Sequence, residues 1–209
     1  MILAIDTSTA ACTAALFDGA GACIARADEV IGRGHAERLV PMTAELLDGR
    51  TASHILVGVG PGSFTGLRVG IAAAHGLAIG WDAELCGMSS LALIAAGVAH
   101  PGPLAVAVRG GHGELFVQQF DDPGLGAPSP VFNLPPAAAA AAISADLVVG
   151  SGAADLVEAR GWGTARERWP SAADAMSLPA QLRCLPPRPL YARAPDARTS
   201  ASLAATQAA

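Results

Sequence analysis

The first thirty residues alternate between short apolar segments and turns of small residues, a pattern typical of β-strands. The apolar segments cover residues 2–6, 12–17 and about 22–28, and Asp18-Gly19 is the clearest turn between them. Because the turns are short, neighbouring strands are expected to run in opposite directions. The start of the chain therefore predicts an antiparallel three-stranded meander.

A helical period replaces this pattern from Ala36 to Leu47, and Asp48-Gly49 ends the run. The apolar positions that recur at helical spacing are Leu39, Met42, Leu46 and Leu47. Pro41 lies inside the segment and is expected to kink or delay the helix, because proline removes a backbone donor.

The continuous apolar run from Ile55 to Val59 predicts a strand that is buried on both faces. It leads into a glycine-rich segment, residues 60–66, and then into a second helical pattern. A strand near Leu85 and a helix from about Ser89 to Ala99 complete the order β-β-β-α-β-α-β-α. This order predicts an α/β lobe in which helices cover a sheet.

The segment His100-Pro-Gly-Pro103 marks a boundary, so we expect one domain over residues 1–100 and another over residues 101–209. The second domain is expected to begin with a hairpin formed by residues 104–109 and 114–120. The later expectations are a loop over 123–136, a helix over 137–143, a strand over 146–149 and disorder from about residue 194.

Composition narrows the class of protein. Of the 209 residues, 52% are hydrophobic, many of them alanine, and 15% are charged. The uncharged apolar stretches are shorter than the roughly 18 residues that a membrane helix needs. The N-terminus lacks the basic region of a secretory signal and reaches a carboxylate at Asp6. We therefore expect a cytoplasmic protein that does not enter a membrane.

The charged and nucleophilic side chains exclude several chemistries. A net charge of -5 disfavours binding of a nucleic-acid phosphate backbone over the whole protein surface, so any contact with RNA is expected to be local. The sequence contains no lysine, which excludes Schiff-base catalysis and P-loop phosphate binding. The four cysteines and five histidines show no metal-ligand spacing, so we expect no metal site and reduced, mostly buried thiols.

Two segments could still carry chemistry. Asp6, Thr7 and Thr9 follow the first strand, where hydroxyls and amides could face a phosphate while Asp6 held a hydrated cation. Turn and capping roles are the commoner use of such residues. The glycine loop that precedes the second helix could present backbone amides to an anion, or could simply cap the helix. Its residues of interest are Gly60, Gly62, Ser63, Thr65 and Gly66.

The segments Ile2–Thr9, Gly34–Met42 and Gly60–Gly70 together resemble the bacterial TsaB family, also called YeaZ. The similarity continues through Gly76–Ala78, Gly87–Leu91, Arg109–Phe120 and Pro189–Arg193, and it is weakest between residues 121 and 185. The resemblance implies an α/β, actin/hexokinase-like (ASKHA) fold of two related lobes, the second one shortened.

The resemblance also implies a function. TsaB proteins are non-catalytic scaffold subunits in the synthesis of threonylcarbamoyladenosine at position 37 of tRNA. They bind the catalytic subunit TsaD and support the ATPase TsaE. The expected partners are therefore a TsaD-like subunit, a TsaE-like ATPase, a second copy of the chain when it is alone, and tRNA indirectly. No cofactor is expected on this chain, because ATP and metal belong to the partner subunits.

Residue roles follow from the same resemblance. Ser90 and Ile94 stand where the catalytic relative carries two metal-binding histidines. The residues expected to be relics of nucleotide-binding loops are Asp6, Thr7, Thr9, Gly150 and Gly152. The residues expected at the partner interface are His35, Leu39, Met42, Arg68, Val69, Gly70, Ala73 and Leu77, which include part of a small-residue stripe on the second helix. This stripe could instead pack on the protein's own sheet, which is the commoner arrangement of alanine-rich faces.

Two other functions remain open from the sequence. An ATP-dependent phosphotransferase of the same fold would use Asp6 and the glycine loop. A peptidase is the second alternative, and the sequence opposes it because it contains no Gly-x-Ser-x-Gly elbow.

Overall fold

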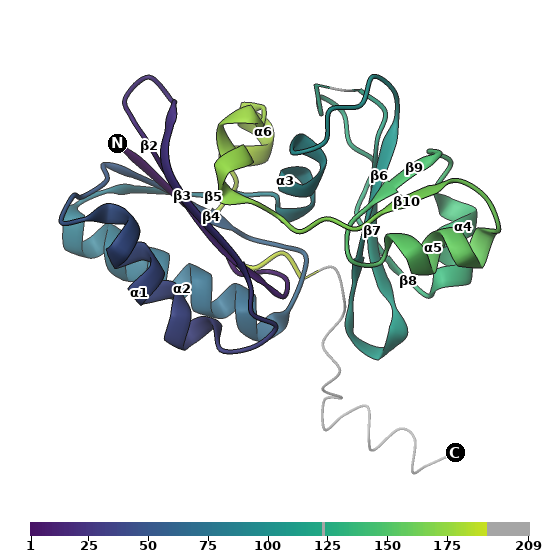
Figure 1. The fold of residues 1–209 in the computed structure, drawn as a ribbon, viewed down its shortest axis with the longest axis horizontal. Helices are drawn as coiled ribbons and strands as arrows, with labels where there is room; N and C mark the ends of the chain where they lie inside the picture. Colours follow the sequence, from purple (N-terminus) through teal and green to yellow (C-terminus); the bar gives the residue numbers. More distant parts are fainter. Residues whose placement is uncertain (123, 192–209) are drawn as a thin grey trace, which may run out of the picture.

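The computed structural model describes residues 1–122 and 124–191, in which two five-stranded mixed sheets lie side by side with helices packed on them (Figure 1). The first sheet contains β1 (Ile2–Asp6), β2 (Ala11–Phe17), β3 (Cys23–Val30), β4 (His54–Gly58) and β5 (Glu84–Met88). The second contains β6 (Leu104–Arg109), β7 (Leu115–Phe120), β8 (Phe132–Leu134), β9 (Leu147–Val149) and β10 (Thr164–Arg166). The helices are α1 (His35–Leu47), α2 (Phe64–Trp81), α3 (Ser90–Ala96), α4 (Pro136–Ala142), α5 (Ala153–Arg160) and α6 (Ala180–Arg183), with short 3-10 segments η1 (Gly111–Gly113) and η2 (Ala172–Ser177).

The two sheets have the same connectivity. The strand order is β3-β2-β1-β4-β5 in the first sheet and, read from the corresponding edge, β8-β7-β6-β9-β10 in the second. In each sheet an antiparallel meander is followed by a helix, a strand parallel to the first one, a second helix and another parallel strand. This repetition confirms the expected actin/hexokinase-like fold of two related lobes. The strands β8, β9 and β10 have only three residues each, in agreement with a shortened second lobe.

The strands β1 and β2 are buried on both faces, which explains their nearly continuous apolar sequence. On one face they pack against α1 and α2 in a core that includes Leu3, Ile5, Leu39, Met42 and Ile71. The opposite face contributes to a core shared with α3 and the second sheet, which includes Ala4, Phe17, Leu93, Val106 and Phe120. Helices therefore cover one side of the first sheet, and the other side joins the two lobes.

After β10 the chain returns to the first lobe. The amide of Ala172, at the start of η2, donates to the hydroxyl of Thr13 at 2.8 Å. Further along, Gly87 and Leu185 exchange two backbone hydrogen bonds of 2.7 and 2.9 Å. Segments after β10 therefore contact the first lobe, and the division into residues 1–100 and 101–209 stays a prediction.

Several local predictions differ from the structure. Helix α1 continues through Pro41 from His35 to Leu47, so a delayed start is wrong. Pro41 is exposed, and the carbonyl that loses its donor can bond to water instead. The helix expected to reach Ala99 ends at Ala96, and the loop expected over 123–136 contains β8.

Elements with weak periodicity were not predicted, namely α5, β10, η2 and α6. The disorder expected from residue 194 falls outside the described residues. Within the described part of the chain, no helix combines the length and the hydropathy needed to cross a membrane.

Candidate functional site

The two segments with candidate chemistry, Asp6–Thr9 and the glycine loop, lie against each other at the edge where β1 and β4 end. These strands are parallel neighbours, so the segments that follow them emerge side by side. The amide of Ser63 donates to the carbonyl of Ser8 at 2.6 Å. The hydroxyl of Thr7 donates to the carbonyl of Gly66 at 2.7 Å. Each segment therefore fills the space in front of the other.

The glycines make this close approach sterically feasible. A Cβ atom at Gly62 would lie 2.1 Å from the Ser8 carbonyl oxygen, and one at Gly66 would lie 2.0 Å from the Thr7 carbonyl oxygen. Side chains do not fit at such distances. Ser63 caps α2 by accepting a hydrogen bond of 3.2 Å from the Gly66 amide. These positions are accordingly explained by the packing of the chain on itself.

Asp6 is buried where these two segments meet. Its side chain is fully buried, and Oδ1 accepts hydrogen bonds from the amide of Ser8 at 2.8 Å and from its hydroxyl at 2.7 Å. Oδ2 accepts from the hydroxyl of Ser90 and lies where a side chain at Gly58 would be. Burial raises the pKa of Asp6, and the hydrogen bonds oppose that shift. This carboxyl group links β1, β4 and α3, with no exposed surface for a hydrated cation.

The second lobe repeats the arrangement at the end of β9. Gly150, which has a positive φ of 120°, would place a Cβ atom 2.3 Å from the carbonyl oxygen of Ala107. The amide of Gly152 donates to that same oxygen at 2.9 Å. The segment expected to be a relic of a nucleotide-binding loop, which contains Gly150 and Gly152, is thus packed on strand β6 of its own lobe. Next to it, Arg109 pairs with Asp155 at 2.6 Å, which lowers the pKa of that carboxyl.

Ser90 and Ile94 are both buried in α3. The Ser90 hydroxyl accepts a hydrogen bond from the amide of Gly60 at 3.1 Å besides donating to Asp6. Ile94 is 1% exposed in the core between the lobes. Neither residue offers a nitrogen ligand. Across residues 1–122 and 124–191, no group of three or more histidines, cysteines and carboxylates is arranged to hold a metal ion.

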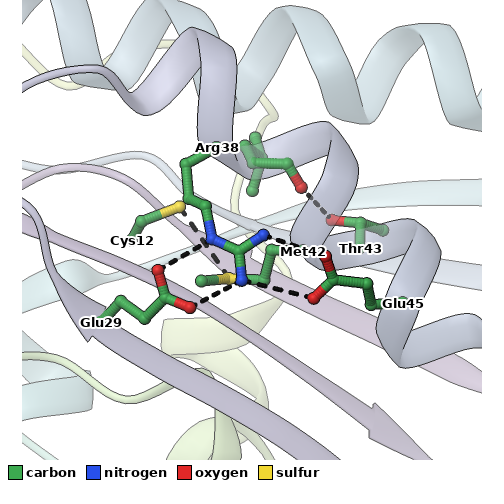
Figure 2. Close-up of polar contacts among 7 residues, drawn as sticks. Cys12, Glu29, Arg38, Met42, Thr43 and Glu45 are labelled. Carbon is green, nitrogen blue, oxygen red and sulfur yellow. Dashed lines mark hydrogen bonds and ion pairs between the residues drawn. The ribbon is translucent and has the colours of Figure 1, made fainter.

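Helix α1 is fixed to the sheet by a guanidinium group. Arg38 donates to both carboxylate oxygens of Glu29 on β3, at 2.8 and 2.6 Å, and lies 3.3 Å from Glu45 two turns further along the helix (Figure 2). This partner lowers the pKa of Glu29. On the inner side of the helix, Nε2 of His35 lies 3.3 Å from the carbonyl oxygen of Ala11. These contacts hold α1 beside α2 on the same face of the sheet.

The residues predicted at the partner interface divide into two groups. His35, Leu39, Met42 and Gly70 are buried within the chain. Leu39 and Met42 are each 1% exposed, and a Cβ atom at Gly70 would meet the Thr7 hydroxyl at 2.4 Å. These four residues hold the helices on the sheet. The prediction that they anchor a partner at the surface is therefore corrected. The remaining members are accessible, Arg68 being exposed and Val69, Ala73 and Leu77 half-buried.

Other apolar residues of the same helices face outward. Val40 of α1 is 62% exposed, and Phe64 and Ile79 of α2 are 55% and 83% exposed. The only titratable side chains in α2 are Arg68 and His75. A helix face of this kind is unusual for a surface that meets only water. The signal was available in the sequence, because these residues are apolar and out of phase with the buried positions.

A serine, a histidine and a carboxylate also meet at the opposite end of the first sheet. The Ser53 hydroxyl lies 3.0 Å from Nδ1 of His54, whose Nε2 lies 3.2 Å from the Glu84 carboxylate. The His54 and Glu84 side chains are 53% and 80% exposed. Acyl transfer relies on a water-excluded site with preorganised donors. This group is better described as a surface ion pair with a hydrogen-bonded neighbour.

A groove of about 430 Å³ lies between β3 and residues 167–174. Its lining carries both signs of charge, including Arg26, Asp28 and Glu167, and the guanidinium of Arg168 pairs with Asp174 at 2.9 Å. Such a mixture does not select for phosphate or for a single cation. The face formed by α1 and α2 is therefore the stronger candidate for a functional site.

Comparison with known proteins relates the chain to tRNA modification. A family described as TsaD, tRNA N6-adenosine threonylcarbamoyltransferase, matches residues 28–124. The tRNA threonylcarbamoyladenosine biosynthesis protein TsaB of Escherichia coli (strain K12) is 42% identical over 102 residues, which cover 46% of this chain and 43% of that protein. The chain spans less than half the length of the curated relatives it matches.

Solved structures match over a greater length. The crystal structure of a Pseudomonas aeruginosa protein described as uncharacterized, with similarity to peptidase YEAZ, has a TM-score of 0.76 and 30% identity. That match covers 92% of this chain and 99% of the other. YeaZ from Pseudomonas aeruginosa has a TM-score of 0.73 and 28% identity, covering 91% and 98% of the two chains. The similarity therefore includes both lobes.

Proposed function

Because the chain belongs to the TsaB (YeaZ) family, we propose that it takes part in the synthesis of threonylcarbamoyladenosine at position 37 of tRNA. In this proposal it is a non-catalytic subunit that binds and supports a TsaD-like catalytic subunit. ATP and the catalytic metal belong to the partner subunits, and tRNA reaches the chain only through the complex.

The proposal that this subunit is non-catalytic is supported by the state of the residues at the positions where nucleotide-binding and metal-binding groups were considered. Asp6 is buried with its oxygens hydrogen-bonded, and the amide of Ser63 is bonded to Ser8 and so is not free to bind a phosphate. Ser90 and Ile94 provide a hydroxyl and a hydrocarbon where imidazoles would be needed. The chain thus uses these positions to hold its own elements together.

The proposed binding role rests on the apolar side chains of α1 and α2 that face outward. Val40, Phe64 and Ile79 are large, more than half exposed, and placed on two helices that pack side by side. Exposed apolar groups on adjoining helices mark a protein interaction site. A partner with a complementary helical surface would remove them from water.

The further partners belong to the same proposal. A TsaE-like ATPase would join the complex after the catalytic subunit, and a second copy of this chain could use the α1–α2 face when that subunit is absent. The complex would work in the cytoplasm, where its tRNA substrate is found.

Reconstitution tests the proposal directly. The chain would be co-purified with the TsaD-like subunit of the same organism, and tRNA modification would be measured with and without the chain. We expect complex formation and modification that depends on both subunits. The matched variants are Ile79→Arg on α2, which should abolish binding, and Ile24→Arg on the distant strand β3, which should not. Unchanged modification without the chain would overturn the proposal.

Calorimetry with ATP and magnesium distinguishes the phosphotransferase alternative. The buried state of Asp6 predicts no measurable heat from the isolated chain. Tight binding that Asp6→Ala removes, in a variant that remains folded, would favour an active enzyme and contradict the scaffold role.

A further inference from the structure

Residues 185–191, called the C-terminal strap from here on, are fixed against the first lobe beside α2. The backbone of Leu185 pairs with Gly87, and the amide of Leu190 donates to the carbonyl of Val59 at 2.8 Å. Between these points, the carbonyl oxygen of Pro187 lies 3.3 Å from Nε2 of His75 on α2. Attachments at both ends and in the middle give the strap a defined place next to the helix.

The end of the strap forms a stacked cluster with the first turns of α2. The ring centroids of Tyr191 and Phe64 are 5.7 Å apart, and the guanidinium carbon of Arg68 lies 3.6 Å from the Phe64 centroid. Nε of Arg68 donates to the Tyr191 hydroxyl at 3.3 Å. Despite these contacts, Phe64 and Tyr191 remain 55% and 52% exposed. Tyrosine and arginine held in one orientation are the residue types that dominate binding energy at interfaces.

Most of the large apolar side chains that are exposed in the described part of the chain lie on the two helices and the strap. Of the eight large hydrophobic residues that are exposed in the described part of the chain, five lie on α1, α2 or the strap, namely Val40, Phe64, Ile79, Leu190 and Tyr191. The other three are Ile24 and Val30 on β3 and Trp162 beyond α5. The strap therefore extends the apolar face of the two helices.

The charge of this face indicates what kind of molecule covers it. Neither α2 nor the strap contains an aspartate or a glutamate, whereas the neighbouring α1 contains Glu37 and Glu45, of which Glu45 pairs with Arg38 of the same helix. Arg68 and Arg188 are exposed and make no ion pair within residues 1–122 and 124–191. A second copy that placed α2 and the strap on the same elements would oppose like charges, which is unfavourable. A different protein that carries carboxylates fits the face better.

We infer that the C-terminal strap is part of the surface that binds the catalytic subunit, with Phe64 and Tyr191 as the anchor. The partner presents an apolar surface to this aromatic pair and carboxylates to Arg68 and Arg188. This inference rests on the proposed function, because it names further residues of the same interface.

The test measures the affinity of full-length variants for the TsaD-like subunit by surface plasmon resonance at two salt concentrations. Tyr191→Ala and Phe64→Ala should each weaken binding about tenfold or more, and together less than the product of the two effects, because they act as one unit. Arg68→Glu should weaken binding and reduce its salt dependence. Ile24→Ala, which removes an equally exposed apolar side chain from β3, should leave the affinity unchanged.

The outcomes separate this inference from the proposed function. If the wild-type chain does not bind the catalytic subunit, the proposed function fails. If it binds and the folded Tyr191→Ala and Arg68→Glu variants bind equally well, the proposed function survives and the strap is not part of the interface. If Tyr191→Ala dissolves a homodimer in sedimentation experiments and leaves binding to the catalytic subunit intact, the occupant is a second copy and the inference is wrong.

Discussion

The hydroxyl of Ser90 donates a hydrogen bond of 2.5 Å to Oδ2 of Asp6, joining positions 84 residues apart in the chain. Asp6 ends β1, and Ser90 begins α3. The two side chains therefore satisfy each other's hydrogen bonding and fix α3 to the central strand of the first sheet.

Substitution of Gly62 by alanine should destabilise the protein severely. The added Cβ atom would lie 2.1 Å from the Ser8 carbonyl oxygen, which belongs to backbone and cannot move away alone. We expect a loss of about 3 kcal/mol or more in the free energy of unfolding, measured by urea denaturation. A glycine loop evolved to hold a ligand would instead tolerate the methyl group and lose only binding.

The matched control is Gly76→Ala on the exposed side of α2. Nothing lies within 4 Å of a Cβ atom at this position, and its φ is not positive. Alanine favours helix over glycine by about 1 kcal/mol, so this variant should be slightly more stable than the wild type. Equal destabilisation by both substitutions would contradict the packing explanation.

The Asp6→Asn variant should change the pH dependence of stability. Burial raises the pKa of Asp6, so the folded state binds this proton more readily than the unfolded state does. The resulting contribution is fully present below the unfolded pKa and is lost as the pH rises through the folded pKa. As the pH rises above the ordinary carboxyl pKa of about 4, the unfolding free energy of the variant should therefore improve relative to that of the wild type.

Urea denaturation at several pH values measures this difference. Asp48→Asn is a suitable control, because Asp48 is exposed and asparagine accepts its left-handed backbone conformation. A constant difference between Asp6→Asn and wild type at every pH would show that the carboxyl group does not titrate as described.

The four cysteines should react with N-ethylmaleimide in a definite order. Cys23 and Cys184 are exposed, so their expected burial is wrong, whereas Cys86 is half-buried and Cys12 is buried. Burial raises the pKa of the Cys12 thiol to about 11, which leaves little reactive thiolate near neutral pH. Mass spectrometry should detect labelling of Cys23 and Cys184 first and of Cys12 only after denaturation. Early labelling of Cys12 would show that α1 separates from β2 in solution.

The Ile79→Ser variant should leave the fold unchanged and alter association. Ile79 is 83% exposed, so its loss should shift the free energy of unfolding by about 0.5 kcal/mol or less. The variant should bind the TsaD-like subunit more weakly in surface plasmon resonance, because an apolar group leaves the proposed binding face. A strongly destabilised variant would mean that Ile79 is packed against the chain in solution.

Most of the fold could be predicted because its elements have strong periodicity. The alternating strands at the start, the helical stripe of Leu39 and Met42, and the apolar run that became β4 each have one clear structural interpretation. The elements that were missed are short or lack a one-sided apolar pattern. Helix α5, with buried Ala153 and Leu156 as its main contacts, is an example.

The site was harder to predict, because sequence position does not say which side of a helix faces a partner. Leu39 and Met42 were expected at the interface, but the apolar stripe that they form faces the core of the chain. The glycine loop was similarly ambiguous. Glycines permit the approach of a ligand or of backbone, and only the position of Ser8 shows which one is present.

The return of the chain to its first lobe has a consequence during translation. The backbone of Gly87 and the carbonyl of Val59 obtain their partners, Leu185 and Leu190, only when residues 185–191 have left the ribosome, which is 98 and 131 codons later. A nascent chain that ends before this point leaves these backbone groups without their partners, so cooperative folding of the first lobe must wait for residues 185–191. Synthesis of this segment thus decides when the first lobe becomes resistant to proteolysis.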